Sequence, residues 1–216
     1  EPFRKAKELV TNGEIGDFRG MRISLSTPND YMTSRKDHWA NKLPGGVIGE
    51  TGPHAVYMTL SFINPVQRVS VDASKIINYP WTPYDDYRID LIGENGTCTI
   101  ISTYSTNQWM ARIEILGTSG ILLLDLEGMS LVKYRREQLN PVSVAVSQMS
   151  ESFQIIKNLL VKGAGYLLGN HHSTHEILIG DFVNSIMNSL DSPVTAEDGR
   201  ESVRVAEMIV KSLNEE

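Results

Sequence analysis

A carboxylate and an imidazole stand four residues apart behind a glycine-rich turn, within the segment Pro44 to Tyr57. The two residues are Glu50 and His54, and they fall where a helix is expected to start, so that positions i and i+4 share one face. Glu50 would then hold His54 in one ring orientation and raise its basicity, which is what a general base needs. A second interpretation stays open, because a histidine before an apolar helix is often hydrogen-bonded into a core.

A long polar segment, Thr27 to Leu43, precedes the glycine turn and carries Tyr31, Trp39 and Lys42. Loops of this length in a compact domain are usually functional or disordered. An aromatic side chain in such a loop can stack on a sugar ring, and a cation can meet a carboxylate or phosphate. We therefore take these three residues as candidate substrate contacts, with an ordinary surface loop as the alternative.

Two further motifs suggest a metal or a nucleotide, but their context argues against both. Ser173 has the spacing of a helix cap, which leaves His171 and His172 outside the following helix and places His175 in its first turn. The glycines of residues 163–169 follow a segment that reads as a helix, whereas a dinucleotide-binding fingerprint follows a strand. We expect neither a metal site nor cofactor-binding residues in this chain.

Composition limits the possible partners. The chain has 216 residues, of which 41% are hydrophobic, a length that fits one large domain. A net charge of −6 without a basic cluster argues against a nucleic-acid partner. The longest apolar stretch, Ile155 to Leu168, is interrupted by lysines and is too short to span a bilayer. The single Cys98 excludes an internal disulfide and suits a reducing cytoplasm, and no secretory signal pattern opens the chain.

The elements that would position the candidate residues begin with a helix over residues 3–11, ended by Asn12-Gly13, and a strand over residues 18–26. A helix from about Pro53 to Phe62 follows the glycine turn. Most of the strand signal lies between residues 66 and 136. There, Glu94-Asn95-Gly96 predicts a hairpin because Asn-Gly supplies positive φ angles, and the other short connections require antiparallel neighbours.

The C-terminal third is predicted to be helical. Capping boxes at Ser173-x-x-Glu176 and Thr195-x-x-Asp198 each precede an apolar stripe. An antiparallel sheet with segregated helices is an α+β fold, and we expect a large, predominantly antiparallel open sheet with helices packed on one face. The other face would stay uncovered. We expect this face to be apolar, and since an uncovered apolar sheet face tends to be an interface, we expect a homodimer or homotetramer built sheet to sheet.

Three stretches resemble the C-terminal, substrate-binding domain of the glucose-fructose oxidoreductase/inositol dehydrogenase (Gfo/Idh/MocA) family. They are Phe3 to Asp17, Gly45 to His54 and Asp181 to Ser212, and they cover essentially the whole chain, residues 1–216. The resemblance implies a dihydrodipicolinate reductase-like C-terminal fold without a Rossmann domain in this chain. It also implies an NAD(P)-dependent oxidoreductase that acts on a sugar, a cyclitol or a related polyol.

By position, His54 matches the histidine that the family uses as acid/base, and Glu50 matches the preceding acidic residue, which is usually aspartate. Tyr57 stands where a second aspartate is frequent. The resemblance further implies that the complete protein uses NAD or NADP, that this chain alone binds neither, and that it is inactive by itself. A second hypothesis is a non-catalytic carbohydrate-binding or scaffolding protein that kept the same fold.

Overall fold

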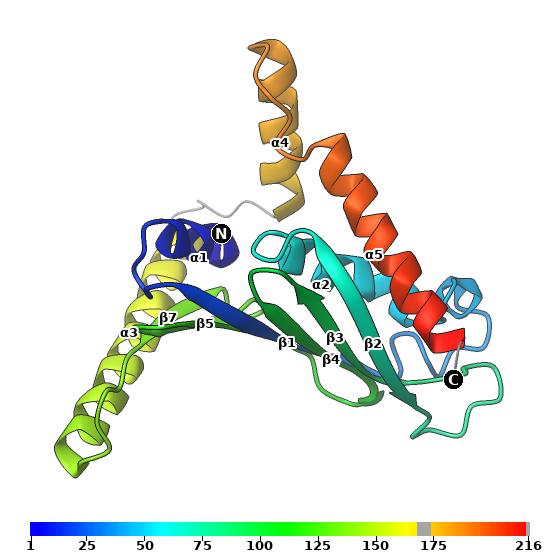
Figure 1. The fold of residues 1–216 in the computed structure, drawn as a ribbon, viewed down its shortest axis with the longest axis horizontal. Helices are drawn as coiled ribbons and strands as arrows, with labels where there is room; N and C mark the ends of the chain where they lie inside the picture. Colours follow the sequence, from blue (N-terminus) through cyan, green and yellow to red (C-terminus); the bar gives the residue numbers. More distant parts are fainter. Residues whose placement is uncertain (168–173, 215–216) are drawn as a thin grey trace.

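The computed structural model describes residues 1–167 and 174–214. Within these residues the helices and strands form one seven-stranded sheet with helices around it (Figure 1). In chain order the elements are α1 (Pro2–Thr11), β1 (Phe18–Pro28), the 3-10 helix η1 (Trp39–Lys42), α2 (Ile48–Leu60), β2 (Val66–Ser74), β3 (Asp86–Gly93), β4 (Thr97–Thr106), β5 (Met110–Gly117), β6 (Ile121–Asp125), β7 (Ser130–Tyr134), α3 (Pro141–Leu167), α4 (Thr174–Met187) and α5 (Ala196–Asn214).

The strands are arranged in the order β2-β3-β4-β1-β5-β6-β7. The first strand of the chain, β1, therefore lies in the centre, parallel to β4 and antiparallel to β5. All other neighbouring pairs are antiparallel. The α+β fold and the predominantly antiparallel sheet are confirmed. The single parallel pair makes the sheet mixed.

The core lies on one face of the sheet. Alternate strand residues such as Ile23, Ile89 and Ile113 point to this face and are buried, as the period of two requires. They form one apolar cluster with Val56 of α2 and Ile209 of α5, among other helix residues. The helices α1, α2 and α5 cover this face, as predicted (Figure 1).

The opposite face of the sheet is open and mostly polar. Ion pairs join Arg22 to Glu114 at 3.4 Å and Arg112 to Asp125 at 3.6 Å across neighbouring strands. Ile101, which is 39% exposed, is an apolar exception. The prediction that this face is apolar is therefore wrong, because the period-2 strands alternate apolar residues toward the helices with charged and hydroxyl residues toward solvent.

The long helix α3 lies along the edge strand β7. The side-chain amide of Gln154 accepts a hydrogen bond from the Lys133 N–H at 2.9 Å and donates one to the Lys133 carbonyl at 3.1 Å. The Asn158 amide donates to the Leu131 carbonyl at 2.9 Å. These bonds occupy backbone groups that an edge strand otherwise leaves open to a further strand.

Helix α4 extends away from the sheet, and an ion pair between Arg4 and Asp181 links it to α1 (Figure 1). The apolar stripe predicted on this helix is exposed rather than buried: Phe182 is 49% exposed and Ile186 is 63% exposed. The cap predicted at Ser173 lies outside the described residues.

The predicted end of α1, the predicted cap of α5 and the predicted β3–β4 hairpin each depend on neighbouring residues, and all three are confirmed. Gly13 ends α1 with φ at +71°, and Thr195 and Asp198 cap α5 by reciprocal side-chain to backbone bonds of 3.0 and 3.1 Å. The β3–β4 hairpin is confirmed, but its predicted positive φ angles are not among those found. Glycine is required at Gly96 for a different reason, since a Cβ there would meet the Phe18 ring at 2.7 Å.

Helix α2 is anchored to the sheet through the buried side chain of Tyr104 in β4. The Tyr104 hydroxyl is hydrogen-bonded to the Thr51 hydroxyl of α2, and it accepts a bond from Ser102 at 3.2 Å. The phenol has little contact with water, so burial raises the pKa of Tyr104 to about 12. The neutral hydroxyl is therefore the form that holds α2 in place.

We predict that Tyr104→Phe lowers the free energy of unfolding by roughly 1–2 kcal/mol at neutral pH, because the hydroxyls of the buried Ser102 and the half-buried Thr51 lose a partner. The measurement is urea unfolding followed by circular dichroism. Tyr79→Phe is the matched control, since no described hydrogen bond uses the Tyr79 hydroxyl, and its stability should stay within about 0.5 kcal/mol of the wild type.

The same variant tests the alkaline limit of stability. The unfolded chain releases the Tyr104 proton near pH 10, the ordinary value, whereas the folded chain holds it to about pH 12. The contribution of the Tyr104 hydroxyl to the free energy of unfolding is therefore fully present below pH 10 and is lost as the pH rises to about 12. Tyr104→Phe should make the decline shallower, and an unchanged decline would contradict the assignment.

Candidate functional site

The glycine turn before α2 has a backbone that other residues do not readily adopt. Gly45 and Gly46 have φ angles of +79° and +74°, in the left-handed region. A Cβ on Gly49 would lie 2.7 Å from the Pro44 carbonyl oxygen, so the first turn of the helix packs directly on the preceding chain.

Helix α2 begins at Ile48 and not near Pro53, where the sequence predicted its start. Proline is favoured in the first turn of a helix, but here it lies inside α2, where its missing N–H leaves the Gly49 carbonyl without its usual donor. The close packing of Gly49 fixes the turn before the proline. The earlier start places Glu50 within the helix.

Glu50, His54 and Tyr57 follow one another at positions i, i+4 and i+7 of α2 and therefore share one face. This face turns away from the sheet: His54 is exposed, and Glu50 and Tyr57 are half-buried. Among the hydrogen bonds of the described residues, none joins Glu50 to His54. Burial and the nearby Asp198 carboxylate raise the pKa of Tyr57, so this face reaches the start of α5.

The polar segment of residues 27–43, which precedes the site, is held in place by hydrogen bonds to β4 and to Trp81. The Thr33 hydroxyl donates to the Asn29 carbonyl at 2.9 Å and to the Tyr104 carbonyl at 3.1 Å. The Trp81 indole N–H donates to the Thr33 carbonyl at 2.9 Å. The segment is thus fixed on the same residue of β4 that anchors α2, and η1 also contacts α2.

Four aromatic rings gather on this segment. The Tyr31 ring lies 5.0 Å from that of Trp109 and 6.4 Å from that of His38, and the His38 ring stacks on Trp39 at 5.8 Å. Tyr31 is 47% exposed, and Trp39 and Trp109 are each 57% exposed. The structure therefore brings two of the candidate substrate contacts, Tyr31 and Trp39, into one exposed aromatic cluster.

Sequence reasoning missed two members of the aromatic cluster, His38 and Trp109. Trp109 lies between β4 and β5, seventy residues beyond Trp39, and the pairing of β1 with both of these strands brings it beside Tyr31. His38 accepts a hydrogen bond from the Ala40 N–H at 3.2 Å and so caps η1. Lys42 is exposed in η1 and makes none of the described ring contacts or ion pairs.

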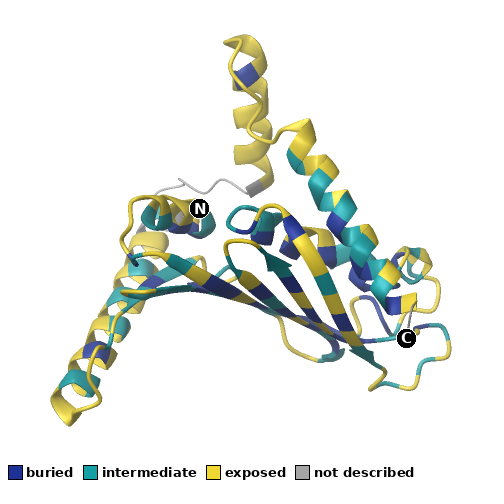
Figure 2. Cartoon of the chain, viewed as in Figure 1, coloured by how far each residue is buried: buried dark blue, intermediate teal, exposed yellow. Residues whose placement is uncertain are grey.

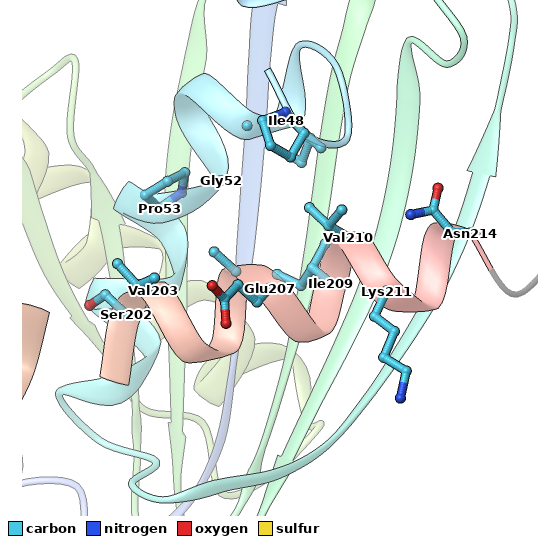
Figure 3. Close-up of a pocket in the computed structure, with 13 residues that line it drawn as sticks. Ile48, Gly52, Pro53, Ser202, Val203, Glu207, Ile209, Val210, Lys211 and Asn214 are labelled. Carbon is cyan, nitrogen blue, oxygen red and sulfur yellow. The ribbon is translucent and has the colours of Figure 1, made fainter. Parts of the chain in front are cut away.

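A groove of about 610 Å³ lies between α2 and α5 (Figure 3). Its lining is mostly apolar and includes Ile48 and Pro53 from α2 and Val203 and Val210 from α5. Glu50, His54 and the aromatic cluster do not line it. The groove is therefore separate from the candidate acid/base face.

The described residues offer no obvious site for a metal or a nucleotide. No group of three or more His, Cys, Asp or Glu side chains among them is placed to hold a metal ion. Gly163 and Gly165 lie inside α3 and not in a turn after a strand; His171, His172 and Gly169 lie outside the described residues. Burial raises the pKa of the Cys98 thiol to about 12, so this cysteine is not a nucleophile at neutral pH.

Among the described helices, none is both long enough and apolar enough to cross a bilayer.

A curated relative of the chain is the uncharacterized oxidoreductase YrbE of Bacillus subtilis (strain 168). It is 24% identical over 221 residues, which cover 98% of this chain and 57% of the relative.

Solved structures share the fold at lower identity. The WlbA dehydrogenase from Bordetella pertussis, determined in complex with NADH and UDP-GlcNAcA, matches with a TM-score of 0.70 and 15% identity, over 99% of this chain and 59% of its own. A myo-inositol dehydrogenase from Corynebacterium glutamicum ATCC 13032 matches with a TM-score of 0.67 and 16% identity, over 98% of this chain and 58% of its own. The chain thus spans less than two thirds of each of these relatives.

The family described as GFO/IDH/MocA C-terminal domain matches residues 3–123, which is more than half of the chain. This match agrees with the mixed sheet and with helices on one face, and it confirms the resemblance that the sequence indicated. The chain belongs to the Gfo/Idh/MocA family of oxidoreductases, as its C-terminal domain.

Proposed function

We propose that residues 1–216 form the substrate-binding and acid/base domain of an NAD(P)-dependent oxidoreductase that acts on a sugar, a cyclitol or a related polyol. The main support is the outward face of α2, where Glu50, His54 and Tyr57 stand together. The exposed aromatic cluster begins just before this helix, and both are fixed on Tyr104. Relatives solved with NADH and a sugar nucleotide, or named for myo-inositol, agree with this substrate class.

In this proposal the dinucleotide is held by a separate domain of the complete protein, because Gly163 and Gly165 lie inside helix α3 and not in a turn between a strand and a helix. A nicotinamide bound there would supply the hydride acceptor for the substrate carbon. His54 takes up the proton of the hydroxyl on that carbon, so that an alcohol becomes a carbonyl. Glu50 orients the imidazole and stabilises the positive charge that the ring gains with the proton. The aromatic cluster stacks on the ring of the substrate, and Lys42 meets an anionic substituent.

Assembly and location remain predictions. A homodimer or homotetramer through the open sheet face would bury the ion pairs of Arg22 and Arg112, which gives this face little apolar driving force. A cytoplasmic location rests on the single, buried cysteine.

A second candidate function is a carbohydrate-binding or scaffolding protein without catalysis. The missing hydrogen bond between Glu50 and His54 favours it, because an acid/base histidine is normally held by a partner. Both functions need the aromatic cluster, whereas only the enzyme needs His54.

We predict that a sugar or cyclitol quenches the tryptophan fluorescence of this chain. The sequence has three tryptophans, Trp39, Trp81 and Trp109. Two of them lie in the aromatic cluster, and Trp81 is the internal reference. Trp39→Ala or Trp109→Ala should weaken binding of myo-inositol or a nucleotide sugar about five- to tenfold, which corresponds to about 1 kcal/mol of aromatic contact. Unchanged affinity in both variants would remove the cluster from the binding site.

In the complete protein, His54→Ala should lower turnover by roughly 10²–10⁴-fold, the range of a positioned proton-transfer group. Glu50→Gln should cost less, since the imidazole remains. His54 is exposed, so the melting temperature should change little. The matched control is His175→Ala, which removes an exposed imidazole from α4. Full turnover after His54→Ala would favour the non-catalytic function.

The chain alone should show no calorimetric heat of binding with NAD or NADP, because the described residues contain no phosphate-binding turn. The complete protein, titrated under the same conditions, is the positive control. Micromolar affinity of residues 1–216 for either dinucleotide would overturn the proposed division of roles between the domains.

A further inference from the structure

A cavity of about 490 Å³ lies at the end of β5 opposite the aromatic cluster. It is lined by the β5–β6 turn, residues 117–120, and by Arg135 and Arg136, which follow β7, and is here called the arginine cavity. Trp109 of the aromatic cluster precedes β5 and Thr118 follows it, so roughly 30 Å of extended strand separates them. The arginine cavity is therefore distinct from the candidate substrate contacts.

Both arginines of the cavity are held by uncharged partners. The Arg135 Nε–H donates to the Ser119 carbonyl at 2.8 Å, and the Arg136 Nε–H donates to the Ser147 hydroxyl at 2.8 Å. The Arg136 guanidinium also lies over the Tyr134 ring, 5.2 Å from its centre. Because the described hydrogen bonds use only Nε, the Nη groups of both side chains keep their N–H donors for another partner.

Helix α3 fixes the position of Arg136. Over residues 141–150, every position of this helix is exposed or half-buried except Ser147, the partner of Arg136 (Figure 2). The Ser147 hydroxyl donates its own proton to the Val144 carbonyl at 2.9 Å. Its oxygen is therefore left to accept the bond from Arg136, and this guanidinium is placed before any ligand arrives.

The charges around the cavity leave the two guanidinium groups in excess. Neither of them has a carboxylate partner among the described ion pairs. The nearby Glu14 carboxylate pairs with Lys133 instead. That of Asp17 pairs with Arg19. Glu137 lines the cavity and is exposed, so the lining has two positive charges and one negative charge, which favours an anion.

The β5–β6 turn adds hydroxyl groups on a fixed backbone. The Thr118 N–H donates to the Asp17 carbonyl at 3.0 Å, and the Ser119 N–H donates to the Ile15 carbonyl at 2.8 Å. The Thr118 hydroxyl accepts a bond from the Asp17 N–H at 3.0 Å, so its own proton stays available. Among the described hydrogen bonds, none uses the Ser119 hydroxyl. Both hydroxyls are therefore free to donate to an anion.

We propose that the arginine cavity binds the phosphate group of a small molecule, either inorganic phosphate or a phosphate monoester. The guanidinium groups of Arg135 and Arg136 pair with phosphate oxygens through parallel N–H···O bonds, and the hydroxyls of Thr118 and Ser119 donate to the same oxygens. A phosphate dianion matches two guanidinium groups in charge, whereas a monocarboxylate leaves one of them without a counter-ion.

The test is isothermal titration calorimetry of the 216-residue chain with inorganic phosphate at constant ionic strength. We expect a Kd below about 1 mM. Arg135→Gln and Arg136→Gln should each raise the Kd about tenfold or more, because each removes charge-assisted hydrogen bonds. Ser119→Ala should raise it about two- to fivefold. Ser119 is exposed, so this variant should keep the melting temperature of the wild type.

Two charge variants serve as controls. Arg88→Gln removes the same charge from an exposed arginine of β3 that has no described ion pair, and the Kd should stay within about twofold of the wild type. Glu137→Gln removes the negative charge from the lining and should lower the Kd about two- to threefold.

Glycerol 1-phosphate, titrated in parallel, distinguishes the two sources of the phosphate group. A lower Kd for inorganic phosphate identifies the free anion as the ligand, and a lower Kd for the ester identifies a phosphorylated small molecule. Absence of binding of both at about 10 mM would contradict the proposal. An equal loss of affinity in Arg88→Gln, or succinate bound as tightly as phosphate, would also contradict it. The result does not depend on the proposed enzymatic function.

Discussion

The candidate site depends on one buried residue, Tyr104. Its hydroxyl holds the first turn of α2 through Thr51, and its carbonyl holds the polar segment through Thr33. The candidate acid/base face and the aromatic cluster are thereby both anchored to one residue of β4. Because β4 pairs with the central strand β1, this residue lies next to the middle of the sheet. A side chain of this size in a core contributes dispersion contacts as well as its hydrogen bonds.

The rest of the site is built from backbone constraints around this residue. Gly45 and Gly46 adopt left-handed conformations in the turn that leads to Gly49. The close packing of Gly49 on the preceding residues fixes the start of α2 before Pro53. As a result, the sheet-facing side of α2 is apolar and fixed, while Glu50, His54 and Tyr57 face outward.

Local sequence signals predicted those parts of the fold that neighbouring residues decide. The cap at Thr195, the helix end at Gly13 and the β3–β4 hairpin all follow from residues within a few positions of each other. The central position of β1, the edge position of α3 and the contact of Trp109 with Tyr31 depend on residues far apart in the chain. Periodicity carries no information on such pairings. The predicted start of α2 is wrong for another reason, because the preference of proline for a first helical turn takes no account of the close packing of Gly49 on Leu43 and Pro44.

The amides of Gln154 and Asn158 offer β7 the same N–H and C=O groups that an additional strand would offer. Helix α3 thus ends the sheet chemically as well as sterically. During synthesis from the N-terminus, the β7 edge stays open to mispairing until these amides arrive, about twenty residues after Tyr134. At about 5–20 residues per second this interval is roughly one to four seconds. The short connection from β7 to α3 therefore limits the time in which a nascent sheet can add a strand from a neighbouring chain.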